Sequence, residues 1–273
     1  MRESSGYLAS GFRDVDGDAD LAKLTACLGF LAGLPSFQAY KARSYQMMRL
    51  KPGQTVADLG CGLGFDLPEL ARRVRPGGRV VGLDASRRLL AQAREVAGGL
   101  EGVELVQGDI LALGFPANTF DAVRVDRTLQ HVTDPRQAIA EMRRVLRPGG
   151  WLVAAEPDWG TFVIDCQDVA TSDLVAQRWR QGFRNPHIGR GLGRMLREEG
   201  LGEVAVEGFI LLAQGLEAVD MVYDLCKTVE MLKEEEGRER ERLAAWLEDL
   251  RRQDASAGVS ASVTLFLACG HKV

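Results

Sequence analysis

The chain has 273 residues, of which 46% are hydrophobic and 26% charged, and its formal net charge is −4. This composition is ordinary for a globular protein, and the length allows one large domain or a core domain with an insertion. The negative net charge disfavours electrostatic binding of nucleic acid, so we expect a small-molecule substrate. The sequence contains no apolar run of membrane-spanning length, and its polar first residues predict no signal peptide.

The cysteines are scattered and odd in number, and the three histidines lie far from one another. Such spacing predicts reduced thiols in a cytoplasmic protein and no metal site. We expect a monomer or a homodimer that binds neither nucleic acid nor a membrane.

Residues 1–18 are rich in Gly, Ser and Asp and are predicted to be irregular. Tyr7 and Phe12 could fold back over a site, or could belong to a frayed terminus. Apolar residues then recur at helical spacing over 19–34, and a second helix is predicted over about 36–50.

The stretch Val56–Asp66 contains an apolar run, then Gly60, Gly62 and Gly64 at alternate positions, and then a helical pattern. It predicts a buried strand, a tight turn and the start of a helix. Glycines allow positive φ and let a ligand lie against the main chain, while the helix start offers free N–H groups. A dinucleotide-binding turn would need glycine at Phe65, so that pattern is excluded.

A second predicted strand, 79–84, ends on Asp84, and Ser86 is placed to cap the helix that follows. A carboxylate at the carboxyl end of this strand can accept hydrogen bonds from the hydroxyls of a ribose. The alternative for Asp84 is an ordinary acid at a helix start. Further on come Gly108-Asp109-Ile110 and the segment 144–152 (Arg-Val-Leu-Arg-Pro-Gly-Gly-Trp-Leu).

In this order, the motifs resemble those of class I S-adenosylmethionine (SAM)-dependent methyltransferases of the methyltransferase-11 type, which includes ubiquinone and menaquinone C-methyltransferases. The resemblance covers residues 40–160 well. It implies an α/β, Rossmann-like sheet of seven strands in the order 3-2-1-4-5-7-6, with an antiparallel last strand and helices on both faces. It also implies an N-terminal helical cover (1–50), a SAM-binding core (51–160), a helical lid insertion (161–200) and a C-terminal part of the core sheet (201–273).

The same resemblance implies SAM as cofactor and S-adenosylhomocysteine as product. Arg43 would meet the carboxylate of the methionine moiety, or else belong to a solvated basic face. Asp84 and Ala85 would lie at the ribose, and Asp109 and Ile110 at the adenine. The other residues expected at the cofactor are Asp58, Gly60, Cys61, Gly62, Gly64, Asp126 and Arg127.

The segment 126–132 follows the fourth predicted strand and should face the transferable methyl group. His131 is a candidate base or substrate-orienting residue because its ordinary pKa is near 6.5, although it could equally serve in packing. Asp158 is the second catalytic candidate, or else an ordinary loop acid. The candidates for substrate binding are Trp159, Phe162, Asn185 and Arg190.

The expected reaction is in-line methyl transfer to an O, N or C atom of a small organic molecule resembling a secondary metabolite. Alignment and desolvation can supply much of the catalysis, so a catalytic triad is not required. One alternative is a SAM-binding protein of this fold that catalyses a cyclisation or rearrangement without methylation. Another is a metal-assisted, catechol-type methyltransferase, in which Asp126 and Asp158 would approach each other.

Overall fold

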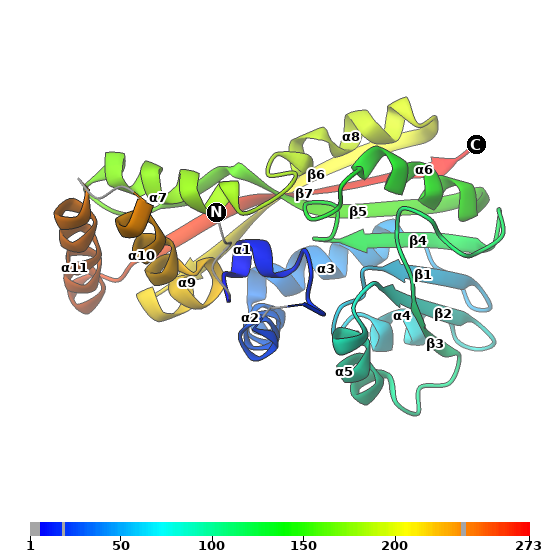
Figure 1. Cartoon of the computed structure of the whole chain (residues 1–273). Coiled ribbons are helices and arrows are strands. Elements are labelled where there is room, and N and C mark those ends of the chain that lie inside the picture. Colours follow the sequence, from blue (N-terminus) through cyan, green and yellow to red (C-terminus); the bar gives the residue numbers. More distant parts are fainter. Residues whose placement is uncertain (1–5, 18–19, 236–238) are drawn as a thin grey trace.

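The computed structural model describes residues 6–17, 20–235 and 239–273. The strands within these ranges are β1 Thr55–Leu59, β2 Arg79–Asp84, β3 Val103–Gln107, β4 Phe120–Asp126, β5 Leu146–Ile164, β6 Leu201–Gln214 and β7 Ser260–Lys272. They form a seven-stranded sheet in the order β3-β2-β1-β4-β5-β7-β6 (Figure 1). β7 is antiparallel to both of its neighbours, and the other adjacent strands are parallel. The predicted fold class and strand order are therefore confirmed.

Helices cover both faces of this sheet. They are α1 Leu8–Gly11, α2 Leu21–Gly33, α3 Pro35–Met47, α4 Leu67–Val74, α5 Arg87–Ala97, α6 Pro135–Val145, α7 Val169–Gln181, α8 Ile188–Glu198, α9 Leu216–Tyr223, α10 Leu225–Glu235 and α11 Arg240–Ser256. The apolar sides of α6 and α8 belong to one core, and those of α3, α4 and α5 to the core on the other face. Because both faces are covered, the central parallel strands are buried apolar runs. Among the described helices, none is both long and apolar enough to cross a bilayer.

The segment 161–200 differs from the predicted lid insertion. β5 continues to Ile164, and its last residues pair with β7, so this part belongs to the sheet. α8 buries Leu192 and Leu196 completely in the core that it shares with α6. Only α7 and the turn after it remain outside the sheet and its covering helix. The sequence pattern of an amphipathic helix such as α8 predicts an apolar face, but it does not show whether that face covers a sheet or a ligand.

The N-terminal residues are tied to the far end of the molecule, where α7 and α9–α11 gather around the extensions of β5, β6 and β7 (Figure 1). The backbone N–H of Leu8 donates to Asp224 Oδ2 at 3.0 Å, and Lys23 Nζ lies 2.7 Å from Asp224 Oδ1. Asp224 has φ +49 and separates α9 from α10. Asp16 accepts hydrogen bonds from Ser86 Oγ at 2.6 Å and from the backbone N–H of Arg87 at 2.8 Å. Residues 6–17 therefore bridge α9 and α10 to the start of α5.

Candidate functional site

The carboxyl ends of the parallel strands open into a cavity of about 520 Å³, which we call the large cavity. This volume falls within the range of about 300–1,000 Å³ that is typical of small-molecule sites. Its walls include the glycine turn after β1 and the strand-end acids Asp84, Asp109 and Asp126. Residues 12–16 of the N-terminal segment also line it. The location agrees with the rule that open α/β sheets bind ligands at the carboxyl ends of their strands.

The glycine turn presents bare main chain to the large cavity. Gly60 and Gly62 have φ of +77 and +54. A Cβ on Gly60 would come within 2.2 Å of Thr128 Oγ1, whereas a Cβ on Gly62 would meet no heavy atom within 4 Å. Asp84 braces the turn, since it accepts hydrogen bonds from the backbone N–H of Gly62 at 2.8 Å and of Ser86 at 2.9 Å. These features fit a nucleoside-type group held close to the backbone.

The third strand-end motif lies on the same cavity. Asp109 and Ile110 both line it, and the carboxylate of Asp109 accepts the backbone N–H of Leu111 at 2.9 Å. Cys61 and Ala85 line it too, whereas Gly64 does not. A Cβ on Gly64 would instead lie 3.1 Å from the Cβ of Ala93, so this glycine allows α5 to approach the turn.

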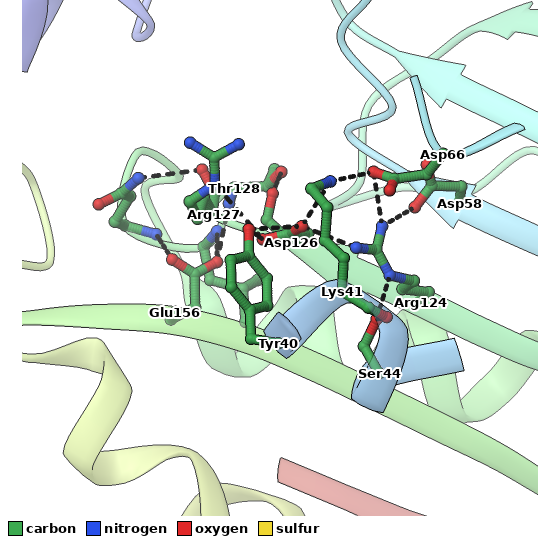
Figure 2. Close-up of polar contacts among 12 residues, drawn as sticks. Tyr40, Lys41, Ser44, Asp58, Asp66, Arg124, Asp126, Arg127, Thr128 and Glu156 are labelled. Atoms are coloured by element: carbon green, nitrogen blue, oxygen red, sulfur yellow. Dashed lines mark hydrogen bonds and ion pairs between the residues drawn. The ribbon is translucent and has the colours of Figure 1, made fainter. Parts of the chain in front are cut away.

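A buried charge cluster lies beside the glycine turn (Figure 2). Arg124 of β4 is only 1% exposed and contacts Asp58 at 2.9 Å, Asp66 at 3.2 Å and Asp126 at 2.7 Å. Lys41 of α3 contacts Asp66 at 2.5 Å and Asp126 at 3.2 Å. All of these residues except Asp58 line the large cavity. The cluster therefore offers both signs of charge to a ligand, as a zwitterionic amino-acid group requires.

Burial and ion pairing affect the acids of this cluster differently. Burial raises the pKa of Asp58 to about 6 against the opposing effect of Arg124, and its Oδ2 has no hydrogen-bond partner among the described residues. Burial also disfavours the charged form of Asp66, but Arg124 and Lys41 outweigh it and hold the pKa of that carboxyl below its ordinary value. Burial likewise opposes ionisation of Asp126, but Lys41 and Arg124 hold its pKa below the ordinary value. Asp66 and Asp126 are thus the ionised acids of this cluster that line the cavity.

Arg43 does not occupy the position expected for it. Its guanidinium pairs with Glu207 of β6, with Nε 2.9 Å from Oε2, and it does not line the large cavity. Two residues correspond to about 200° around a helix, so Lys41 and Arg43 point in nearly opposite directions. The basic side chain of α3 at the site is therefore Lys41, which the sequence pattern did not single out.

A second, smaller cavity of about 60 Å³ adjoins the large one and is walled by aromatic rings. Trp159 stacks on Phe183 with ring centroids 4.5 Å apart, and Trp179 and Tyr223 complete the box around Trp159. The residues that line both cavities are Phe12, Leu28, Arg127, Gln130 and His131. We call these five residues the junction. The two cavities are thus neighbouring chambers of one site.

His131 lies at this junction between the rings of Phe12 and Phe183, at centroid distances of 5.7 and 5.6 Å. Burial, followed by the charges of Arg13, Arg127 and Arg184, lowers its pKa to about 3. A histidine with this pKa is neutral near pH 7 and a weak base, which favours the orienting role over the base role.

The loop that carries Arg127, Gln130 and His131 is fixed by hydrogen bonds from two neighbouring segments. The carboxylate of Glu156 accepts the backbone N–H groups of Thr128 at 2.7 Å and Leu129 at 2.5 Å. Asn185 donates from Nδ2 to the carbonyls of Leu129 at 2.9 Å and Val132 at 2.7 Å. Asn185 lines neither cavity, so its contacts support the loop and do not form the predicted substrate contact.

Asp158 and Arg190 are placed differently from the prediction. Successive strand residues point to opposite faces, and Pro157 and Trp159 line the small cavity while Asp158 does not. The buried Asp158 carboxylate pairs with Arg190 and lies 3.2 Å from His187 Nδ1. The structure therefore brings neither Asp158 nor Arg190 to the lining of either cavity.

Two further expectations concern the walls of the site. Phe162 packs on Tyr223 with centroids 4.5 Å apart, behind the wall of the small cavity and outside its lining. Asp126 lines the large cavity and Asp158 lines neither, so the approach required for metal-assisted catalysis is not found. The residues that the structure describes contain no group of three or more His, Cys, Asp or Glu side chains able to hold a metal ion.

Residues 50–200 match a family model described as a methyltransferase domain. A protein of Streptomyces fradiae, described as an uncharacterized 37.1 kDa protein in transposon TN4556, is 40% identical over 201 residues, which are 73% of this chain and 58% of that protein. The demethylmenaquinone methyltransferase of Bacillus cytotoxicus is 39% identical over 133 residues, which are 47% of this chain and 56% of the enzyme. The chain thus spans little more than half the length of these curated relatives.

Solved structures agree in fold at low sequence identity. The YcgJ protein of Bacillus subtilis has a TM-score of 0.59 at 18% identity, with 86% of this chain and 98% of that chain covered. The [4+2]-cyclase SpnF has a TM-score of 0.56 at 22% identity, with 98% and 100% covered. Phosphoethanolamine N-methyltransferase 2 of Haemonchus contortus, solved with SAM, has a TM-score of 0.59 at 19% identity, with 97% and 60% covered.

The family model covers more than half of the chain, and the fold and glycine turn agree with it. The chain belongs to the methyltransferase-domain family, among the class I SAM-dependent methyltransferases. The cofactor of this family is S-adenosylmethionine.

Proposed function

We propose that this chain transfers a methyl group from SAM to a small, largely apolar organic molecule. The observation that carries the proposal is the pair of joined chambers, a polar one at the glycine turn and an aromatic one beyond the junction. The relatives named demethylmenaquinone methyltransferase support a small-molecule acceptor. The five free cysteines fit a cytoplasmic protein.

The large cavity suits the parts of SAM in a definite order. Asp84 is positioned for the ribose hydroxyls, and Asp109 and Ile110 for the adenine. In the charge cluster, Lys41 would attract the carboxylate of the methionine moiety, and Asp66 its ammonium group. This arrangement directs the amino-acid end of the ligand toward α3.

The bound cofactor supplies a methyl group that its positive sulfur already activates. The residues of the chain then have to align the acceptor and exclude water. The stacked Trp159 and Phe183 give a flat apolar wall against which an aromatic acceptor would pack. Phe12 closes both chambers from the N-terminal side.

A cyclisation or rearrangement without methyl transfer is the second candidate. The fold permits it, because the [4+2]-cyclase SpnF shares this fold over 98% of the chain. The large cavity would be the same in both cases. The two functions differ in whether SAM is consumed.

The first experiment is calorimetric titration of the protein with SAM and with S-adenosylhomocysteine, followed by incubation with SAM and a panel of aromatic and polyketide-like acceptors. We expect micromolar binding of both ligands and a gain of one methyl group on an acceptor, detected by mass spectrometry. An isomerised acceptor with SAM unconsumed would support the cyclase. Failure to bind either ligand would exclude both functions.

A matched pair of variants on α3 tests the orientation of the cofactor. Lys41→Met should weaken SAM binding by about 1.5–3 kcal/mol, because it removes a charged partner of the ligand. Arg43→Met should leave SAM binding unchanged, because Arg43 faces Glu207 away from the cavity. If Arg43→Met weakened SAM binding and Lys41→Met did not, Arg43 and not Lys41 would be the residue that meets the carboxylate of the methionine moiety.

A further inference from the structure

We propose that the acceptor reacts as an oxyanion, an ionised phenol or enol, and that Arg127 binds this oxyanion at the junction of the two chambers. This inference rests on the proposed methyl transfer and names the chemical class of its acceptor. It is carried by the geometry of Arg127 and by the polar atoms around the small cavity.

The backbone of Arg127 is held in an uncommon conformation. Its φ is +53, in the left-handed region that L-residues other than Asn and Asp rarely adopt. Its N–H donates to the carbonyl of Ala155 at 2.8 Å, and its carbonyl accepts from Gln130 Nε2 at 3.0 Å. Such strain persists where the surroundings fix a residue, and it is commonly found at functional sites. Here it accompanies a side chain that lines both cavities.

The guanidinium of Arg127 makes no hydrogen bond to any residue that the structure describes, and its Nε is buried. Its nearest carboxylate oxygen is Asp126 Oδ1, 3.5 Å from Nε. The Asp126 carboxylate already pairs with Arg124 at 2.7 Å and Lys41 at 3.2 Å. The carbon atom of the Arg127 guanidinium lies 5.0 Å from the ring centroid of Phe37. The Arg127 guanidinium thus has one loose ion pair and, among the described residues, no hydrogen-bonded acceptor for its five N–H donors, and a ligand could supply that acceptor.

Two other nitrogen atoms of residues that line the small cavity also lack a hydrogen-bond partner within the described part of the chain. His131 Nδ1 and Trp179 Nε1 are buried without a hydrogen-bond partner among the described residues, and an indole N–H can only donate. Gln130 is already committed, because it donates to the Arg127 carbonyl and accepts from Trp159 Nε1 at 2.8 Å. A ligand that satisfies this chamber therefore brings oxygen acceptors.

The charges around the junction favour a negative ligand. Among the described residues that line the small cavity, Arg127 is the one charged side chain, and none is a carboxylate. Arg13 and Arg184, which line the large cavity, act electrostatically on His131. The acids that line the large cavity all have partners within the chain. Asp14, Asp84 and Asp109 accept backbone hydrogen bonds, Asp16 accepts from Ser86 and Arg87, and Asp66 and Asp126 pair with Lys41 and Arg124. In a chamber of low polarity, these guanidinium groups would lower the pKa of a bound hydroxyl.

The transfer step then balances without a protein base. The acceptor releases its proton to solvent on binding. A lone pair on its anionic oxygen, or on a carbon conjugated with that oxygen, forms the bond to the methyl carbon as the carbon–sulfur bond breaks and its electron pair stays on sulfur. The negative charge of the acceptor and the positive charge of the sulfonium cancel. This explains how the site can operate with a neutral His131.

The test uses the complex of the full chain with S-adenosylhomocysteine and two probes, 4-nitrophenol and its methyl ether 4-nitroanisole. The absorbance of the nitrophenolate reports the protonation state of the bound phenol. We expect the apparent pKa of bound 4-nitrophenol to fall by about one unit, and the phenol to bind at least about tenfold more tightly than the ether above that pKa.

Arg127→Met should abolish the pKa shift and the preference for the phenol, while calorimetry shows that S-adenosylhomocysteine still binds. Arg127→Lys keeps the charge and should retain part of both effects, which separates loss of charge from loss of structure. Arg72→Met, at an exposed arginine of α4 that pairs with Glu69, is the matched control and should change neither. Equal affinity for phenol and ether, no binding of either probe, or an unaltered shift in Arg127→Met would each overturn the inference. The SAM titration would still stand in those cases, so the two proposals fail separately.

Discussion

The large cavity and the small cavity, which we call the cofactor chamber and the acceptor chamber after the ligands we propose for them, are built by opposite means. The cofactor chamber takes its walls from consecutive strand ends on β1, β2 and β4, and its buried charges neutralise one another around Arg124. The acceptor chamber takes its rings from segments far apart in the chain, from Phe12 to Tyr223, and Arg127 is the charge on its lining. One chamber is thus held by electrostatic contacts of fixed geometry, and the other by packing.

This difference suits the two ligands that we propose. A cofactor shared by a whole family needs fixed hydrogen-bond partners, which strand ends supply with little freedom. An acceptor that varies between enzymes is better served by a wall of rings, because their identity and tilt can change without breaking a charge network. Substitutions in the first chamber should therefore have larger effects on stability and cofactor binding than those in the second.

The largest effect is expected for Arg124→Met. This change leaves the buried carboxylates of Asp58, Asp66 and Asp126 without their shared partner, and breaking a buried ion pair costs about 3–5 kcal/mol. Urea unfolding of the purified variant measures the loss in free energy of unfolding. Arg43→Met, which removes an exposed pair with Glu207, should leave the free energy of unfolding nearly unchanged. Similar losses in the two variants would show that the cluster is not the electrostatic centre of the cofactor chamber.

A smaller effect, confined to binding, is expected for Asp84→Ala. The variant loses the ribose acceptor and the brace on the Gly62 N–H, so SAM affinity should fall by about 1.5–3 kcal/mol in calorimetry. The control is Asp121→Ala, at a carboxylate that accepts the backbone N–H of Thr55 at the opposite end of the sheet. SAM affinity should be unchanged in that control. Unchanged affinity in a folded Asp84→Ala variant would remove Asp84 from the ribose site.

The cofactor chamber could be predicted well because its residues occupy positions that local patterns define. A glycine turn after an apolar strand, and an acid at the end of the next strand, fix Gly60, Gly62 and Asp84 without tertiary information. Asp109 and Ile110 follow from the family resemblance, and all five residues line the large cavity. The strand order could be predicted because the family resemblance carries the topology with it.

The predictions that differ from the structure concern positions where a shift of one or two residues along a helix or strand changes the direction of the side chain. On α3 the pattern did not show which basic side chain points inward, because this helix buries Phe37, Tyr40, Tyr45 and Met47 around much of its circumference. On β5, alternation places Trp159 at the acceptor chamber and Asp158 on the other face, but the sequence pattern does not show that the strand extends as far as these residues.

The acceptor chamber shows a different limit. Phe12, Trp179 and Phe183 meet His131 and Trp159 only through the tertiary fold, and nothing in their local sequence indicates that they converge. The aromatic residues at the N-terminus were noted as able to fold back, and the structure places Phe12 at both cavities and Tyr7 against Trp179. A cluster of rings assembled across the chain has no periodicity for a sequence pattern to detect.

The smallest of these effects concerns acid stability at the junction, and His131→Phe tests it. The pKa of His131 is about 3 in the folded chain, well below its ordinary value, so below pH 6.5 the unfolded chain binds a proton that the folded chain does not. Its contribution to stability is therefore complete above about pH 6.5 and is lost as the pH falls toward 3. His131→Phe removes this dependence and keeps a ring between Phe12 and Phe183.

When the pH is lowered from 7.5 to 5.5, the wild type should lose about 1 kcal/mol of unfolding free energy that His131→Phe does not lose, as measured by urea unfolding at both pH values. The SAM affinity of the variant should be unchanged. Parallel pH profiles would mean that His131 titrates normally in a hydrated chamber, where it could serve as a base after all. In that case the contrast between a charged cofactor chamber and an aromatic acceptor chamber would no longer hold. The acceptor chamber would then contain a hydrated side chain that can take a proton from the acceptor.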